Sequence, residues 1–343
     1  MIPHYKSIHN KFKINGLHLN KSELLQLAYI FIKEGEEYEI EMGKFLLDWF
    51  DNLSTITLPT SGTTGSQKLI TLHKQAMVNS AIATADFFNL KPGDTALHCL
   101  PTRYIAGKMM LVRAIIIGLE IDTVNPTNIF NKENINENYS FCAMVPIQAE
   151  KNLSYLKNIH TLILGGTPMN KKLINELSVI SKNIYETYGM TETITHIAAK
   201  KIGDEYFKTF PEVEISQDER GCLVIEASYL FNDKLVTNDL VEILNPNYFK
   251  WLGRADNVIN SGGIKIFPEQ IEQKLLDKLE NRFYIGSKKD EKLGQQVVLY
   301  IEGKTLIIDE SELFKYLTKY EIPKEIIFVE KFSETETGKI IRN

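Results

Sequence analysis

The nine residues TSGTTGSQK at 60–68 are the segment whose residue types most directly suggest chemistry. Glycine lets consecutive backbone N–H groups curl around an anion, while hydroxyl side chains and a closing lysine add donors and positive charge. A polyphosphate is therefore the predicted ligand. The segment is not a Walker loop, because Gln67 stands where that loop requires glycine before the lysine. A flexible turn is the alternative, since turns favour these residues anyway. The residues expected to bind phosphate are Thr60, Ser61, Gly62, Thr63, Thr64, Gly65 and Lys68.

This loop resembles the phosphate-binding signature of the adenylate-forming superfamily, which includes acyl-CoA synthetases, luciferases and the adenylation domains of peptide synthetases. Other segments resemble further signatures of the family and follow in the family's order. They are LILGGTPM (162–169), YGMTET (188–193), LVTNDL (235–240), LGRADN (252–257) and TGKIIR (337–342). The likeness covers most of the chain and implies an enzyme that activates a carboxylic acid with ATP. Only 59 residues precede the loop, fewer than in typical members, so we expect a trimmed N-terminal subdomain.

The resemblance also implies which residues bind the nucleoside. In the family, a glycine pair after a strand lies against adenine and the acyl group, and an aromatic ring stacks on adenine. An aspartate bonds both ribose hydroxyls, and an arginine contacts ribose and phosphate. The matching residues of this chain are Gly165, Gly166, Tyr188, Gly189, Asp239 and Arg254.

Three residues match the family's catalytic positions: Thr191, Glu192 and Lys339. The resemblance implies that the Thr191 hydroxyl meets the α-phosphate, that Glu192 holds Mg²⁺, and that Lys339 is the catalytic lysine. Attack of a carboxylate on a phosphate brings two anions together, so positive charge and ordered donors lower the barrier. No nucleophilic side chain is required. The alternatives are an ordinary exposed lysine and a carboxylate at a helix end.

The second half-reaction, transfer of the acyl group to coenzyme A, is implied by the family in the same way. There the C-terminal domain rotates about a hinge residue, which Asp256 matches. Ser261, Gly262 and Gly263 resemble the strand that lines the coenzyme A tunnel. A simple hairpin turn is the alternative explanation of these glycines.

The acid pocket is predicted from the cationic stretch LPTRYIAGKMMLVRA at 100–114. Arg103, Lys108 and Arg113 are unusual for a pocket that binds a fatty chain, and together they favour an acid with a second carboxylate. Tyr104 is expected at the gate of the pocket, and His196 is a second candidate for its wall. A solvated helix face and a core histidine are the alternatives. The stretch resembles the compact o-succinylbenzoate–CoA ligases of menaquinone biosynthesis.

The resulting hypothesis is an AMP-forming acid–thiol ligase that uses ATP and Mg²⁺, with coenzyme A as cosubstrate. Another aryl- or acyl-CoA ligase and a stand-alone enzyme that loads a carrier protein remain alternatives. A degenerate, binding-only relative is disfavoured, because none of the expected charged positions has been lost. Oligomeric state cannot be predicted from the sequence.

Composition excludes several other classes of function. The formal net charge is -5 over 343 residues, which argues against a nucleic-acid partner or an anionic membrane surface. The cysteines Cys99, Cys142 and Cys222 form no CxxC pair, so we expect buried free thiols. No secretory segment opens the chain and no apolar run is long enough for membrane insertion, so a cytoplasmic protein is expected.

The pattern of apolar residues predicts an α/β protein. Strand-like and helical runs alternate up to residue 189, which indicates a mostly parallel sheet, and a β subdomain is expected beyond residue 195. We predict an AMP-binding N-terminal domain at 1–254, and a small mobile α+β C-terminal domain at 255–343 that carries Lys339. Ser22 is the expected N-cap of the first helix. The helices are expected at 22–34, 39–52, 73–88, 106–118, 170–181, 268–278 and 310–319. The strands are expected at 55–60, 95–100, 140–146, 161–168, 183–189, 222–228 and 234–244.

Overall fold

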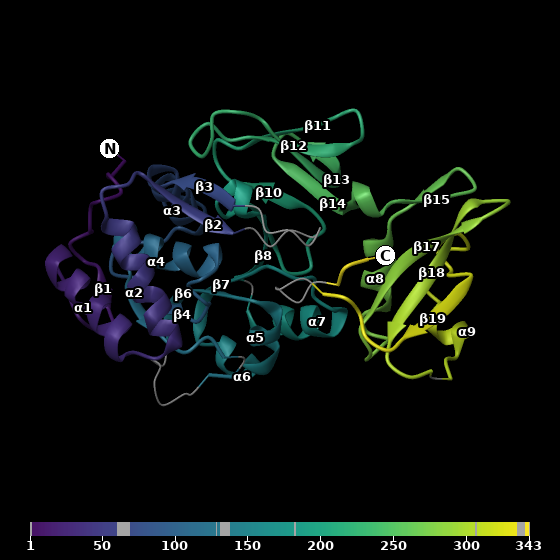
Figure 1. The fold of residues 1–343 in the computed structure, drawn as a ribbon, viewed down its shortest axis with the longest axis horizontal. Helices are drawn as coiled ribbons and strands as arrows, with labels where there is room; N and C mark the ends of the chain where they lie inside the picture. The colour runs from purple at the N-terminus through teal and green to yellow at the C-terminus, as the bar shows by residue number, and fades with distance from the viewer. Residues whose placement is uncertain are drawn as a thin grey trace.

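A computed structural model shows a mixed α/β fold built on one large sheet (Figure 1). The structure describes residues 2–59, 69–127, 129–130, 138–181, 183–305, 307–334 and 340–342. Within these residues no helix combines the length and the apolar character that a membrane span requires.

Over the residues that the structure describes, the large sheet has 12 strands, and its first half is parallel. In spatial order this half contains β1 (Lys13–Ile14), β5 (Glu120–Thr123), β4 (Thr95–His98), β6 (Tyr139–Met144), β7 (Ile159–Leu164) and β8 (Ile184–Gly189). Crossover helices between these strands cover the sheet, as expected for a parallel arrangement. The predicted mostly parallel α/β layer is therefore confirmed.

The second half of the sheet is antiparallel and continues directly from β8. It contains β9 (His196–Lys201), β10 (Phe207–Thr209), β14 (Tyr248–Arg254), β13 (Leu235–Asn245), β12 (Cys222–Glu226) and β11 (Glu214–Gln217). This half corresponds to the β subdomain that was expected beyond residue 195. A separate antiparallel pair, β2 (Thr55–Pro59) and β3 (Leu69–His73), flanks residues 60–68.

The helices of this part pack on the sheet through apolar faces. They are α1 (Lys21–Glu34), α2 (Glu37–Phe50), α3 (Lys74–Phe88), α4 (Ile105–Ile117), α5 (Pro146–Lys151), α6 (Leu153–Leu156) and α7 (Lys171–Ile180). Helix α4 is apolar on nearly all sides and is buried along most of its length, as a central helix must be. The predicted N-cap of α1 was wrong: Asn20, not Ser22, accepts from the backbone N–H groups of residues 22 and 23, and Glu23 bonds back to it.

A five-stranded sheet follows Arg254 and lies at one end of the long axis in Figure 1. Its strands are β15 (Ile259–Ser261), β16 (Ile264–Ile266), β17 (Phe283–Asp290), β18 (Gly294–Glu302) and β19 (Glu325–Val329). Helix α8 (Pro268–Leu275) packs its buried Ile271 and Leu275 against this sheet, and together they form a separate hydrophobic core. The predicted helix at 310–319 was wrong in length, because α9 (Glu310–Leu313) ends after one turn.

The three cysteines are free and buried, as expected. Cys99 and Cys142 are far apart in sequence, yet their sulfur atoms lie 3.8 Å apart because β4 and β6 are neighbours.

Candidate functional site

Several residues expected to bind ATP cannot be placed. Thr60, Ser61, Gly62, Thr63, Thr64, Gly65, Lys68 and Lys339 lie outside the described residues. What is described lies on either side of this segment: Pro59 and Leu69 are paired across β2 and β3.

The predicted glycine pair lies at the carboxyl end of β7, where ligands of parallel sheets bind. Gly166 has φ +94°, a conformation that favours glycine. Gly165 approaches the neighbouring strand so closely that a Cβ atom would come within 2.8 Å of the Thr187 hydroxyl oxygen. Thr187 in turn donates to the Leu164 carbonyl at 3.1 Å. The backbone at Gly165 and Gly166 therefore carries no side chain and is held in place beside the end of β8.

Residues 190–195 form a tight turn after β8, and this turn carries Thr191 and Glu192 on the short helix η2 (Thr191–Thr193). The buried Thr193 hydroxyl fixes the turn: it accepts from the Met190 N–H at 2.9 Å and lies 2.6 Å from the Thr195 carbonyl. A Cβ atom at Gly189 would overlap the Thr195 carbonyl oxygen, so the turn requires glycine there.

Tyr188, Asp239 and Arg254 are brought together from three different strands, β8, β13 and β14. The Tyr188 hydroxyl donates to Asp239 Oδ2 at 2.6 Å, and Arg254 Nη1 lies 3.6 Å from Asp239 Oδ1. Burial, together with the Asp239 carboxylate, raises the pKa of the Tyr188 phenol, so the phenol stays protonated as a donor. The Tyr188 ring packs edge-on against Phe249, with centroids 5.1 Å apart.

Glu192 is exposed and lines a cleft of about 550 Å³ between β3 and residues 228–235. Among the described residues it has no hydrogen-bond or ion-pair partner. In the part of the chain that the structure describes, no group of three or more His, Cys, Asp and Glu side chains is arranged so that it could hold a metal ion. A single free carboxylate suits Mg²⁺, which is bound by one or two carboxylates together with substrate phosphates.

Two of the predicted acid-pocket cations already have partners. Arg103 is exposed, pairs with Glu41 at 3.0 Å and stacks on the exposed Tyr104 ring. Lys108 is half-buried and donates to the Thr102 carbonyl at 2.7 Å. Burial lowers the pKa of Lys108, partly opposed by nearby carboxylates.

Arg113 and His196 lie buried behind the η2 turn. Arg113 is 1% exposed and donates to the Thr195 hydroxyl at 3.2 Å, and among the described residues its Nε has no partner and no carboxylate pairs with it. Burial lowers the pKa of Arg113 to about 9, so it remains charged at neutral pH. Burial, followed by the charge of Arg113, lowers the pKa of His196 well below its usual value. The neutral imidazole lies 3.1 Å from the Thr84 hydroxyl. Arg113 is therefore a fixed positive charge in an apolar setting.

The predicted hinge and tunnel residues follow β14. Asp256 lies on the short helix η3 (Ala255–Asn257), and its carboxylate accepts from Arg254 at 3.4 Å and from Asn238 at 3.1 Å. Ser261 pairs with Ile264, so the glycines between them form a two-residue hairpin loop. Gly262 has φ +59° and Gly263 has φ +83°, which this kind of turn requires. The hairpin accounts for the glycines locally, and the tunnel stays a prediction.

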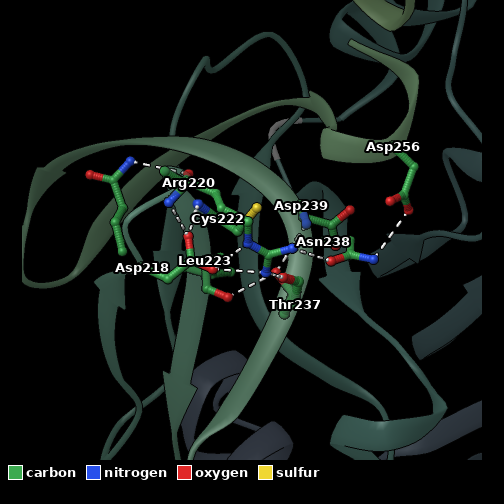
Figure 2. A network of polar contacts seen from close by, with 10 residues as sticks. Asp218, Arg220, Cys222, Leu223, Thr237, Asn238, Asp239 and Asp256 are labelled. Carbon is green, nitrogen blue, oxygen red and sulfur yellow. Dashed lines mark hydrogen bonds and ion pairs between the residues drawn. The ribbon is translucent and has the colours of Figure 1, made fainter.

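Sequence reasoning grouped Arg113 with Arg103 and Lys108 without ranking it above them, and it missed Asn238 and Arg220 altogether. The signal for Arg113 was available: it lies within IAGKMMLVRAIII, a helix so apolar that a cation in its second half must be buried. No comparable signal marks Arg220, because its contact with Asn238 depends on strand pairing between β12 and β13 (Figure 2).

Comparison with known proteins gives consistent results. Residues 51–219 match the family model of the AMP-binding enzyme. A 2-succinylbenzoate–CoA ligase of Listeria monocytogenes is 29% identical, over 90% of this chain and 73% of that protein. A ligase of the same name from Oceanobacillus iheyensis is 26% identical, over 86% and 70%.

Two solved structures are also similar. An acyl-CoA synthetase (AMP-forming)/AMP-acid ligase II-like protein from Dyadobacter fermentans is 34% identical, with a TM-score of 0.63, over 94% of this chain and 96% of that one. The o-succinylbenzoate CoA synthetase of Bacillus subtilis, in complex with its acyl-adenylate intermediate, has a TM-score of 0.73 at 21% identity, over 84% and 68%. The latter likeness shows a shared fold.

Proposed function

The chain belongs to the AMP-binding enzyme family, and from this premise we propose that it is an AMP-forming ligase that joins o-succinylbenzoate to coenzyme A. In the first step the succinyl carboxylate attacks the α-phosphate of ATP, and pyrophosphate leaves. In the second step the thiol of coenzyme A attacks the acyl carbon, its proton is released, and AMP leaves.

The burial of Arg113 is the observation on which the proposed choice of acid substrate rests. A buried guanidinium without a carboxylate partner among the described residues is costly, and it is stabilised when an anion pairs with it. Because Arg113 contacts the turn that carries Glu192, an acid bound there would have its second carboxylate neutralised. A plain monocarboxylate would leave the charge unpaired. The relatives named as 2-succinylbenzoate–CoA ligases support the same choice.

The nucleoside is assigned to the Tyr188, Asp239 and Arg254 group. The side chain of Asp239 is only 8% exposed and its two oxygens have different partners, so it is held in one orientation for a pair of ribose hydroxyls. Arg254 supplies the positive charge beside it. The bare backbone at Gly165 and Gly166 leaves room for a flat base next to β8. Together these features support a nucleotide site at the switch between the parallel and antiparallel halves of the sheet.

Mg²⁺ would be held by Glu192, and when bound it would neutralise charge on the phosphates of ATP. An o-succinylbenzoate coenzyme A synthetase of Bacillus subtilis with this fold contains ATP and a magnesium ion, which supports the assignment. Thr191 would donate to the α-phosphate, the 60–68 loop would bind the outer phosphates, and Lys339 would stabilise the transition state of the first step.

We further infer a division at Arg254, with residues 1–254 forming the AMP-binding domain and residues 255–343 a mobile domain. The change from the 12-stranded to the five-stranded sheet after β14 supports it. In this proposal Asp256 is the hinge and residues 261–263 line the path of coenzyme A. The proposed substrates are small molecules, and a cytoplasmic location is part of the proposal because the cytoplasm supplies ATP and coenzyme A.

Exchange of labelled pyrophosphate into ATP tests the choice of acid. We expect o-succinylbenzoate to give a higher kcat/KM than benzoate, acetate or a long fatty acid. If a plain monocarboxylate gives the highest value, the assignment of Arg113 and of the substrate fails.

A further inference from the structure

Arg254 lies between two carboxylates of unlike environment. On one side is Asp239, whose side chain is 8% exposed, at 3.6 Å; on the other is Asp256, 62% exposed, at 3.4 Å. Neither contact is the close two-bond pairing that a guanidinium and a carboxylate form when both are free. Asp256 lies only two residues from Arg254, on the short η3 segment after β14. Its carboxylate would therefore close on Arg254 unless another contact restrained it.

Asn238 is that restraint. Its Nδ2 donates to Oδ2 of Asp256 at 3.1 Å, the same oxygen that Arg254 approaches at 3.4 Å. The shared oxygen is therefore drawn toward β13 and away from the guanidinium. Figure 2 shows Asn238 on the strand with Asp256 across the gap from it.

Arg220 fixes the orientation of the Asn238 amide. Its Nη1 donates to Asn238 Oδ1 at 2.9 Å, and its Nη2 donates to the Thr237 carbonyl at 3.0 Å. A flipped amide would place its oxygen against the Asp256 carboxylate and its NH₂ group against the Arg220 guanidinium, which both charges disfavour. The network in Figure 2 thus has one favourable arrangement.

Asp218 anchors Arg220 from the other side. One carboxylate oxygen accepts from Arg220 Nε at 2.7 Å, and the other accepts from the backbone N–H groups of Arg220 and Cys222, each at 2.9 Å. The chain of contacts therefore runs from a turn before β12, across β13, to the segment after β14. Every link is a charged or strongly polar pair.

We propose that Arg220 and Asn238 are positioning residues for nucleotide binding, which hold Asp256 off Arg254 so that this guanidinium stays available to the nucleotide. The inference rests on the proposed function for the role of Arg254. Without the restraint, Asp256 closes on Arg254 as a two-bond pair and competes with the phosphate and ribose for it.

The test compares Asn238→Ala and Arg220→Lys with the Asp256→Asn and Asn238→Ala/Asp256→Asn variants. The probe is AMP, whose Kd is measured by calorimetry, with KM for ATP in pyrophosphate exchange as a second reading. We expect Asn238→Ala to raise the Kd of AMP and the KM for ATP about threefold to fivefold, which is the effect expected from one partly exposed ion pair. Lysine at 220 cannot donate in the fixed fork of arginine, so it should act in the same direction. The KM for the acid should not change.

The Asp256→Asn background provides the decisive comparison. There the competing carboxylate is gone, so Asn238→Ala should have no further effect on the Kd of AMP. Asn245→Ala, an exposed asparagine at the far end of β13, is the matched control, and its melting temperature sets the reference for a purely structural effect.

Two results would overturn the inference: an unchanged Kd of AMP in Asn238→Ala and Arg220→Lys, or an equal loss when Asp256 is already asparagine. If the acid proves to be a different one, the AMP measurements still apply. A failure of the proposed substrate is therefore distinguishable from a failure of the restraint.

Discussion

The Tyr188 hydroxyl and the Asp239 carboxylate lie 2.6 Å apart, although 51 residues separate them in sequence. The bond joins the last parallel strand to the antiparallel half of the sheet, and it leaves the buried carboxylate with one oxygen facing Arg254. A phenol whose pKa is raised by burial is a dependable donor throughout the neutral range. The two halves of the sheet thus meet at the proposed nucleotide site.

Removing that hydroxyl with Tyr188→Phe should weaken nucleotide binding and lower stability together. The ring and its packing on Phe249 remain, while the buried Asp239 carboxylate loses a strong hydrogen bond. We expect the free energy of unfolding to fall by about 1–3 kcal/mol, with an increase in KM for ATP. Chemical denaturation and exchange kinetics measure the two effects.

The control is Tyr206→Phe, since the Tyr206 hydroxyl bonds an exposed carboxylate of Glu242 at the same distance of 2.6 Å. It should change stability little, because water replaces a lost surface bond. Equal losses in the two variants would contradict the special role of the Tyr188–Asp239 bond.

Arg113→Met should raise KM for o-succinylbenzoate with much less effect on KM for ATP. A charged hydrogen bond in a buried site contributes about 1.5–3 kcal/mol, which corresponds to roughly tenfold to a hundredfold in binding. Stability should hold or improve, because methionine fills similar space without an unpaired buried charge. Steady-state kinetics and a thermal melt check both statements.

Arg103→Met is the matched control for Arg113. Arg103 is exposed and already paired with Glu41, so its loss should leave KM for the acid nearly unchanged. If Arg103→Met has the larger effect on that KM, the acid pocket lies at the outer end of α4, and the assignment to Arg113 is wrong.

Glu192→Gln should lower the rate of adenylation more than it weakens ATP binding. The substitution keeps size and hydrogen-bonding capacity but removes the charge that would hold Mg²⁺. Loss of one strong electrostatic stabiliser lowers kcat on the order of a hundredfold, and raised Mg²⁺ should restore part of the rate. Glu192 is exposed, so the melting temperature of the free protein should not change. A large drop in melting temperature with a normal rate would show a structural role instead.

Two buried histidines should make the protein less stable in mild acid. Burial lowers the pKa of His98 from 6.5 to about 4, so between these values the unfolded chain binds a proton that the folded chain does not. Stability therefore falls as pH decreases through this window, by roughly 3 kcal/mol for this residue. The pKa of His196 is shifted in the same direction, which adds to the slope.

Denaturant unfolding at pH 7 and pH 5 checks this linkage. The pH dependence of stability should be shallower in His98→Gln than in the unaltered protein. An identical slope in His98→Gln would mean that the His98 imidazole takes up its proton in the folded state.

Local patterns predicted the helices and strands well where the outcome depends on immediate sequence neighbours. The apolar period placed α3 and α4 within a residue or two, and the glycines around β7 and β8 lie where their short signatures suggested. Prediction failed where the outcome depends on distant pairing. The Cys99–Cys142 approach, the Asp239–Tyr188 bond and the Arg220–Asn238 contact all require the strand order of the sheet. The pocket cations could not be ranked either, since only tertiary contacts show that Glu41 pairs with Arg103, while no carboxylate among the described residues pairs with Arg113.

The most direct test of the account is product analysis of a single reaction that contains the protein, ATP, Mg²⁺, o-succinylbenzoate and coenzyme A. The thioester, AMP and pyrophosphate should form in equal amounts, and omission of coenzyme A should leave a protein-bound acyl-adenylate. Formation of ADP and phosphate, or of AMP without any thioester, would contradict an AMP-forming ligase that uses this acid and this thiol.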